Sequence, residues 1–195
     1  MPAFPPVTLV GRLVRLEPLA DRHLAALEAA ASDPELWTFV PRPADTSEGF
    51  AAWMALARAD EAAGRALVFA TCLPDGTVIG STRFANVSIP DGRAEIGWTF
   101  IGRDHQRTGV NREAKRLMLA HAFDTLGLER VELKTDARNV PSCTAIAALG
   151  AVEEGTLRRH TRTHTGFLRD TVYFSILKDE WPAVRDRLNE RLNAH

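Results

Sequence analysis

The stretch Glu95-Ile-Gly-Trp-Thr-Phe-Ile-Gly-Arg-Asp-His-Gln-Arg-Thr-Gly-Val-Asn111 decides the fold, because it joins a strand to a helix through a polar loop. The strand is predicted over residues 94–101. A helix is predicted over residues 110–126, where apolar residues recur at helical spacing. A loop that enters a helix presents free backbone N–H groups and the positive end of the helix dipole, and Gly109 lets the backbone approach a ligand closely. The stretch therefore predicts a binding site for an anion such as a pyrophosphate.

On both sides of this stretch the pattern predicts further strands and helices. Upstream, strands are predicted over residues 7–16, with a turn or bulge at Gly11, and over residues 66–73 and 78–87. Helices are predicted over residues 21–31 and 47–63, the second capped by Ser47. Downstream, strands are predicted over residues 130–135, 152–163 and 170–177, and helices over residues 141–150 and 181–192. Turns at Pro74-Asp75-Gly76 and Asp91-Gly92 make the central strands antiparallel. The helix after residue 110 requires a parallel crossover to the next strand.

The predicted fold is therefore of the α/β (α+β) class. It has a mixed, mostly antiparallel sheet with one parallel strand pair, and helices flank the sheet. Ligands favour the place where the strand direction changes in such a sheet. The length of 195 residues suits a single domain over residues 1–195.

The composition is that of an ordinary soluble protein, with 45% hydrophobic and 25% charged residues. The formal net charge of −1 argues against a general nucleic-acid partner. The two cysteines, Cys72 and Cys143, are expected to be reduced thiols. No apolar stretch approaches the roughly 20 residues of a membrane span, and the first residues do not have the pattern of a signal peptide. We therefore expect a cytoplasmic protein without a membrane partner.

Several short motifs resemble those of one family. Gln106-Arg-Thr-Gly-Val-Asn111 resembles the Q/R-x-x-G-x-G/A motif of the GNAT (GCN5-related) N-acetyltransferases. It departs from that motif at Asn111, although asparagine tolerates a left-handed backbone better than most residues. Asn139-Val-Pro-Ser142, followed by Leu149-Gly-Ala151, resembles the family's N-x-x-S/A and L-G-A/F segment. Glu113-Ala-Lys115 and Arg169-Asp-Thr-Val-Tyr-Phe-Ser175 resemble the Rim-type branch, the ribosomal-protein-alanine/serine N-acetyltransferases.

The resemblance implies a GNAT fold in which two parallel strands splay apart to hold acetyl-coenzyme A, the acyl donor, without a metal. Pantetheine would pair with the backbone of the first strand, and the loop amides would hold the pyrophosphate. The implied cofactor-binding residues are Trp98, Thr99, Phe100, Ile101, Gln106, Arg107, Thr108, Gly109, Val110, Asn111, Arg112, Asn139 and Ser142.

Acyl transfer to an amine requires a neutral nucleophile, and deprotonation costs about 1 kcal/mol for an α-amino group and about 4–5 kcal/mol for a lysine-like amine. Glu95, in the family's Glu-Ile-Gly-Trp/Tyr pattern, is the candidate general base; the alternative is a surface carboxylate on a hairpin strand. The resemblance also implies a tyrosine acid in the last short helix, but Ile146 stands there and Tyr173 is the chain's one tyrosine. Ser142 is the candidate replacement, and its alternative role is a helix cap. Cys143 as an acyl carrier conflicts with the family's direct transfer.

In the family, the loop Asp33-Pro-Glu-Leu-Trp-Thr-Phe39 roofs the acceptor site. Glu35, Trp37, Phe39 and Glu95 are therefore the candidate substrate contacts, and the alternative for the two aromatic residues is to staple the first two helices together. The expected acceptor is a primary amine of a protein N-terminus or of a small molecule. The sequence does not identify that amine.

The alternative hypothesis is a non-catalytic protein that has the same fold and binds acyl-coenzyme A without transferring the acyl group. Asn111 and the missing tyrosine favour it. A nucleotide-binding protein of the Rossmann or P-loop type is excluded, because neither glycine pattern follows a strand. His160 and His164 lie on a predicted strand, too far apart to share a metal. The C-terminal strands, with an exposed edge, favour a homodimer.

Overall fold

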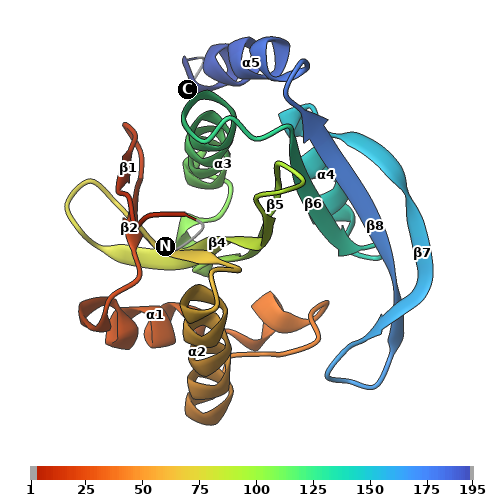
Figure 1. Cartoon of the computed structure of the whole chain (residues 1–195). Coiled ribbons are helices and arrows are strands. Elements are labelled where there is room, and N and C mark those ends of the chain that lie inside the picture. Colours follow the sequence, from red (N-terminus) through yellow and green to blue (C-terminus); the bar gives the residue numbers. More distant parts are fainter. Residues whose placement is uncertain (1–3, 194–195) are drawn as a thin grey trace.

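A computed structural model describes residues 4–193, and within them the strands form one sheet in the order β1-β2-β3-β4-β5-β6-β8-β7 (Figure 1). The strands are β1 (Leu9–Val10), β2 (Arg15–Pro18), β3 (Leu67–Cys72), β4 (Val78–Ser88), β5 (Arg93–Ile101), β6 (Arg130–Asp136), β7 (Val152–Arg162) and β8 (Leu168–Leu177). The α-helices are α1 (Leu24–Ala31), α2 (Ser47–Ala62), α3 (Val110–Ala120), α4 (Val140–Leu149) and α5 (Trp181–Asn193). Short helical turns are η1 (Asp21–His23), η2 (Pro34–Trp37), η3 (Arg103–His105) and the π-helical turn η4 (His121–Thr125).

The strand directions confirm the predicted fold class. Each neighbouring pair in the sheet is antiparallel except β5 and β6, which run parallel. The crossover between these two strands is α3 with η4. The parallel pair lies in the middle of the sheet, so the strand direction changes where the motif-bearing loop leaves β5.

Helices cover both faces of the sheet (Figure 1). On one face, α1 and α2 enclose a core that contains Trp37, Trp53 and Phe100. On the other face, α3, α4 and α5 pack over a larger core that contains Met118 and Leu188. The loop after β5 passes from the first face to the second, and it therefore connects the two sides of the sheet.

Three predicted boundaries differ from the structure. Residues 7–16 form two short strands instead of one, because Gly11 N donates to Val14 O at 2.8 Å and turns the chain back. The cap of α2 is Thr46, whose Oγ1 accepts the Gly49 N–H at 3.1 Å, so the prediction of Ser47 was wrong by one residue. The predicted helix 110–126 ends as a π-helical turn, in which Leu126 N donates to His121 O.

Within the described residues, no helix is both long enough and apolar enough to span a membrane.

Candidate active site

A gap between β5 and β6 is the central feature of the site. The two strands pair at only three positions, which end at Glu95 opposite Glu132. β5 then continues to Ile101 and β6 to Asp136, each without the other. The far edge of β6 remains paired with β8 up to Asp136, so β6 stays in the sheet while its β5-facing edge is left open. Open backbone groups of this kind can pair with an extended ligand.

A bulge in β5 shapes one wall of this gap. The pairing with β4 shifts between Ser81–Phe100 and Arg83–Gly97, which leaves one extra residue in β5. Trp98 lies in this bulge and has a φ of 53°. This backbone conformation costs a residue with a bulky side chain roughly 1–3 kcal/mol. Bulges of this kind redirect backbone groups next to active sites. The bulge begins the segment Trp98–Ile101 that was expected to face pantetheine.

A buried arginine supports the bulge. The guanidinium of Arg83 lies 4.4 Å from the Trp98 ring and 4.7 Å from the Trp53 ring, between the two. None of its nitrogens has a hydrogen-bond partner among residues 4–193, and the nearest carboxylate, that of Asp60, is 3.9 Å away. Burial lowers the pKa of Arg83 to about 10. A desolvated cation against two indoles gains about 2 kcal/mol or more per ring, which is of the same size as the strain at Trp98.

The loop after β5, where an anion site is predicted, leads into the start of α3. Gly109 caps the helix with a φ of 90°, and Arg107 also has a positive φ of 62°. Gln106 Nε2 donates to Ile101 O at 3.0 Å, and Thr108 Oγ1 donates to His105 O at 2.7 Å, so both side chains hold the loop's own backbone. The first amides of α3 have no partner within the helix, and they open toward the loop.

Two predicted loop residues have different environments from those expected. Asn111 lies inside α3 with a helical backbone, so its tolerance of the left-handed region is not used; Arg107 and Gly109 occupy that region instead. Arg112 reaches the end of α5, where its Nη1 donates to Arg191 O at 3.2 Å. Arg107 is exposed and is the arginine best placed to meet a phosphate at this loop.

A cavity of about 350 Å³ adjoins the loop, and it is lined by Asp33, Glu35, Leu36, Arg103, Gln106 and Arg107. Arg103 crosses its rim, where Nε lies 2.7 Å from Asp33 Oδ2 and the guanidinium also pairs with Glu35. These exposed ion pairs join η2 to the loop after β5. Glu35 thus faces Arg103 rather than Glu95.

Glu95 lies at the base of the gap, where the parallel pairing ends. Its side chain is buried. Oε2 accepts a hydrogen bond from Asn86 Nδ2 at 2.7 Å and forms an ion pair with Lys134 Nζ at 2.7 Å. Oε1 lies against Gly97, where a Cβ atom would come within 2.8 Å of it. The Glu-x-Gly spacing therefore has a steric reason, and the alternative of an exposed surface carboxylate is wrong because Glu95 is buried.

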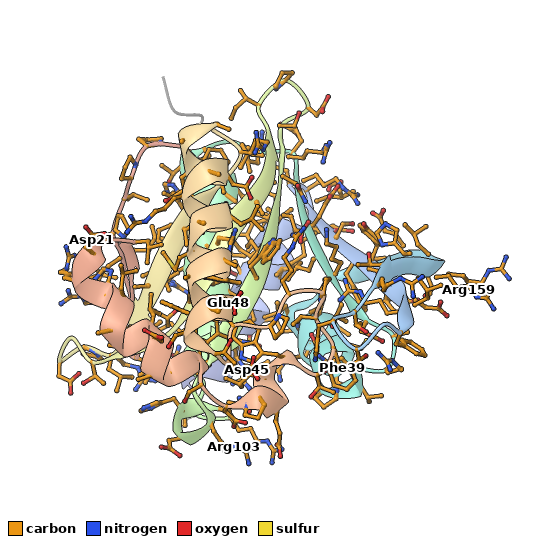
Figure 2. All side chains as sticks on the ribbon, turned by 90° about the horizontal axis from the view of Figure 1, so that it is seen from below. Asp21, Phe39, Asp45, Glu48, Arg103 and Arg159 are labelled. Carbon is orange, nitrogen blue, oxygen red and sulfur yellow. The ribbon has the colours of Figure 1, made fainter. Side chains whose placement is uncertain are left out.

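The η2 loop and the β7–β8 hairpin contact each other on the side of the sheet where the acceptor is predicted to bind. Phe39 O accepts a hydrogen bond from Arg169 Nη1 at 2.9 Å, and Val40 O accepts one from His164 Nδ1 at 3.1 Å. Figure 2 shows Phe39 beside this hairpin, with Arg103 lower on the same face. Trp37 instead turns into the core, where its indole donates to Ala31 O at 2.7 Å and packs on Phe100. Trp37 therefore staples the helices, and Phe39 remains the candidate contact.

Helix α4 begins beside the open end of β6. Asn139 caps it, with Oδ1 accepting the Ser142 N–H at 3.1 Å. The hydroxyl of Ser142 has no hydrogen bond among the described residues. Ile146, at the position where the resemblance implies a tyrosine, is buried in the core under α4. Burial raises the pKa of the Cys143 thiol, which disfavours a thiolate there.

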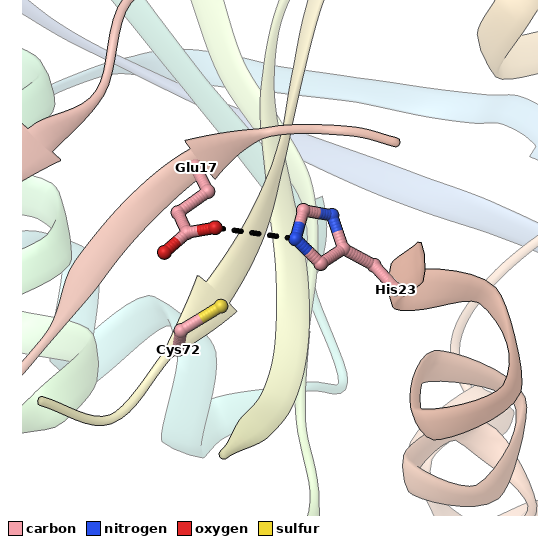
Figure 3. A group of neighbouring side chains, drawn as sticks. All are labelled: Glu17, His23 and Cys72. Atoms are coloured by element: carbon pink, nitrogen blue, oxygen red, sulfur yellow. Dashed lines mark hydrogen bonds and ion pairs between the residues drawn. The ribbon is translucent and has the colours of Figure 1, made fainter. Parts of the chain in front are cut away.

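A second polar cluster, Glu17, His23 and Cys72, lies away from the gap (Figure 3). His23 Nδ1 accepts the Ala20 N–H at 3.2 Å, so Nε2 carries the proton and donates to Glu17 Oε2 at 3.3 Å. The hydrogen bond from Arg22 holds the pKa of Glu17 at about 2, and burial raises that of Cys72 to about 11. All three groups are thus engaged or protonated, and the cluster serves as a hydrogen-bond network.

Comparison with known proteins identifies the family. The acetyltransferase (GNAT) domain profile matches residues 13–152. The chain belongs to the GNAT acetyltransferase family.

Its relatives support the Rim-like branch. A protein named N-acetyltransferase p20, from Bacillus licheniformis, is 36% identical over 104 residues, which are 53% of this chain and 57% of p20. A protein of Bacillus subtilis named for ribosomal N-acetyltransferase activity, YdaF, is 32% identical over 56% of this chain and 58% of its own. The chain thus spans somewhat more than half the length of these curated relatives.

Solved structures match over nearly the whole chain. A GCN5-related N-acetyltransferase from Brucella melitensis is 31% identical with a TM-score of 0.87, over 97% of this chain and 86% of its own. Mycobacterium smegmatis RimJ, in a complex with coenzyme A disulfide, is 27% identical with a TM-score of 0.82, over 95% of each chain.

Proposed function

We propose that this protein transfers the acetyl group of acetyl-coenzyme A to a primary amine by direct attack. One observation carries the proposal: a buried carboxylate, Glu95, lies at the base of a gap between parallel strands whose far end opens beside a helix N-terminus. This arrangement has a place for a phosphate, a strand edge for an extended chain, and a base at the end of that chain.

The cofactor is proposed to run from the helix to the bulge. The amides of Gly109 and of the first turn of α3 would bind the pyrophosphate, with Arg107 adding positive charge. The backbone of Trp98–Ile101 would pair with pantetheine along the unpaired edge of β5. The side-chain nitrogen of Asn139, Nδ2, remains free to bind pantetheine, because the cap of α4 uses the side-chain oxygen Oδ1.

Proton transfer is proposed to use Glu95 and Ser142. Glu95 would accept the proton of the acceptor ammonium, and the neutral amine would attack the thioester carbonyl. Ser142 would donate a hydrogen bond to the leaving sulfur in place of the missing tyrosine. The acceptor would enter between the η2 loop and the β7–β8 hairpin, past Phe39. The named relatives favour a protein N-terminus as this amine, and a small-molecule amine is the other class.

The binding step is tested by calorimetric titration with acetyl-coenzyme A. Gly109→Glu places bulk and negative charge at the expected pyrophosphate, so we expect binding to be lost. Gly109→Ala is the matched control, because it introduces the same strain at a φ of 90° without the charge. A folded wild-type protein that does not bind acetyl-coenzyme A would contradict the proposal.

The chemical step is tested by amine-dependent release of the coenzyme A thiol. We expect Glu95→Gln to lower kcat about 10²–10⁴-fold for a lysine-like acceptor, with a smaller loss at high pH, where the amine is already neutral. Glu132→Gln is the control, since Glu132 lies opposite Glu95 on β6 and binds Arg130. Binding without turnover over a broad amine panel would favour the non-catalytic reading.

A further inference from the structure

The side chain of Lys134 forms an ion pair with Glu95, the candidate general base. Lys134 Nζ lies 2.7 Å from Glu95 Oε2. Lys134 stands on β6 two residues beyond the last parallel pair, so its side chain reaches back across the mouth of the gap. The ammonium also lies 5.7 Å from the centre of the Tyr173 ring on β8. The Lys134 side chain keeps 26% of its surface exposed, so it is not part of the core.

Lys134 presents its amine where an acceptor amine has to be. Glu95 Oε1 is packed against Gly97, and Oε2 receives both Asn86 and Lys134. An external ammonium that gives its proton to Glu95 would therefore approach Oε2, the atom that Lys134 already contacts. An acceptor and Lys134 compete for one place.

We infer that Lys134 is an acetylation site of the enzyme itself, modified in cis by bound acetyl-coenzyme A when no external amine is present. This inference rests on the proposed function, because it uses the same thioester and the same base. The Lys134 ammonium gives one proton to Glu95. Nζ then forms an amide bond to the acetyl carbon, and the carbon–sulfur bond breaks. The thiolate takes up the second proton that Nζ loses as the amide forms, and Glu95 releases the first proton to solvent, so the products are N-acetyl-Lys134, coenzyme A and one proton.

The modification changes the charge at the base. The unmodified ammonium is paired with Glu95 and opposes entry of a second cation. Acetyl-Lys134 is neutral and leaves the negative charge of Glu95 for the acceptor ammonium. Acetylation therefore converts a self-occupied site into one that is open to an amine.

The chain provides its own controls for the experiment. Lys178 is also paired with a glutamate, Glu129, at 2.6 Å, but it lies on the surface far from the gap and is 48% exposed. Non-enzymatic acetylation would therefore favour Lys178. Lys115 is buried on the opposite face of the sheet, where it binds Thr82 and Thr99.

The test is peptide mass spectrometry after incubation of the full chain with acetyl-coenzyme A and no added amine. Trypsin cuts after unmodified Lys134 and not after acetyl-lysine, so modification yields the uncut peptide of residues 131–138. We expect up to one acetyl group per chain at Lys134, at a rate independent of protein concentration. Glu95→Gln should slow it by about 10²-fold or more. Lys134→Arg, which keeps the positive charge, should gain no acetyl group in this segment.

The inference would be overturned by no acetylation of Lys134 in a protein that binds acetyl-coenzyme A by calorimetry, or by equal rates at Lys134 and Lys178. Loss of binding in the calorimetric titration would instead show that the proposed function itself fails. The inference of modification in cis would also be overturned if the rate of Lys134 acetylation rose with protein concentration. The amine of one molecule would then react at the site of a second molecule.

Discussion

Lys115 is a buried cation that has no carboxylate partner among residues 4–193. Its Nζ donates to Thr99 Oγ1 at 2.6 Å and to Thr82 Oγ1 at 3.1 Å, directly beneath the bulge of β5. Burial lowers its pKa to about 7. The unfolded chain, with a lysine pKa of about 10.4, therefore binds more protons than the folded chain between about pH 7 and 10. The free energy of unfolding should rise with pH across that window, and the full cost of burial is present below it.

We therefore expect Lys115→Met to stabilise the protein, on the order of a few kcal/mol at pH 6 and much less at pH 9. Urea unfolding at the two pH values measures the difference. Lys178→Met, at an exposed lysine, is the control and should change little at either pH. A gain for Lys115→Met that is equal at both pH values would show that packing, and not the charge, sets the effect.

For single residues, the sequence predicts those whose role depends on their neighbours along the chain. Gly109 was predicted because a helix start is visible in sequence, and Glu95 because it lies on the strand before the cofactor segment and matches the family's Glu-Ile-Gly-Trp/Tyr pattern. Lys134 and Arg83 were missed, because their roles depend on which residues of neighbouring strands lie opposite them. One signal was available: a lysine in a strand that alternates with buried Val131 and Leu133 has to point to the other face of the sheet.

Among the elements, the β1–β2 hairpin is tied to α3 by one side chain. Glu113 is buried, and its carboxylate accepts the backbone N–H groups of Arg12, Leu13 and Val14 at 3.0, 2.5 and 2.9 Å. A Cβ atom at Gly11 would lie 2.4 Å from Glu113 Oε2, so the turn also requires glycine. This contact gives the Glu-Ala-Lys segment a structural role.

Glu113→Gln is expected to cost about 2–4 kcal/mol of stability, because it removes the charge and turns an NH₂ group toward a backbone donor. Chemical denaturation measures the loss, and Glu190→Gln on the exposed face of α5 is the matched control. An unchanged midpoint in Glu113→Gln would mean that the hairpin does not depend on this carboxylate.

The elements that the sequence placed well are those specified by nearby residues. α3 and α4 follow from helical spacing and from Gly109, Pro141 and Gly150 at their ends. Gly11 indicated a turn or bulge within residues 7–16, but the full split into two strands depends on Glu113, which holds the turn from about a hundred residues away in sequence. The π-helical end of the crossover depends on packing and has no comparable local signal.

For the whole molecule, the narrow join between β5 and β6 divides the sheet into two parts. One part contains β1 to β5 and the other β6, β8 and β7, and three residue pairs connect them within the described sheet. The proposed cofactor would contact both parts, at the loop around Gly109 and at Asn139 on α4. Acetyl-coenzyme A at a hundred times its Kd should then raise the free energy of unfolding by about 2.7 kcal/mol.

Hydrogen exchange distinguishes a bridging ligand from one held on a single side. We expect acetyl-coenzyme A to protect the amides of residues 96–101 and 106–112 together with those of residues 139–142, because pantetheine would close the gap between the two parts. Gly109→Glu should show neither change, while Gly109→Ala should retain both if the charge is what repels the cofactor. Protection confined to residues 106–112 would mean that only the pyrophosphate is held. The acetyl group would then not be delivered to Glu95, and both the direct-attack mechanism and the acetylation of Lys134 would lose their basis.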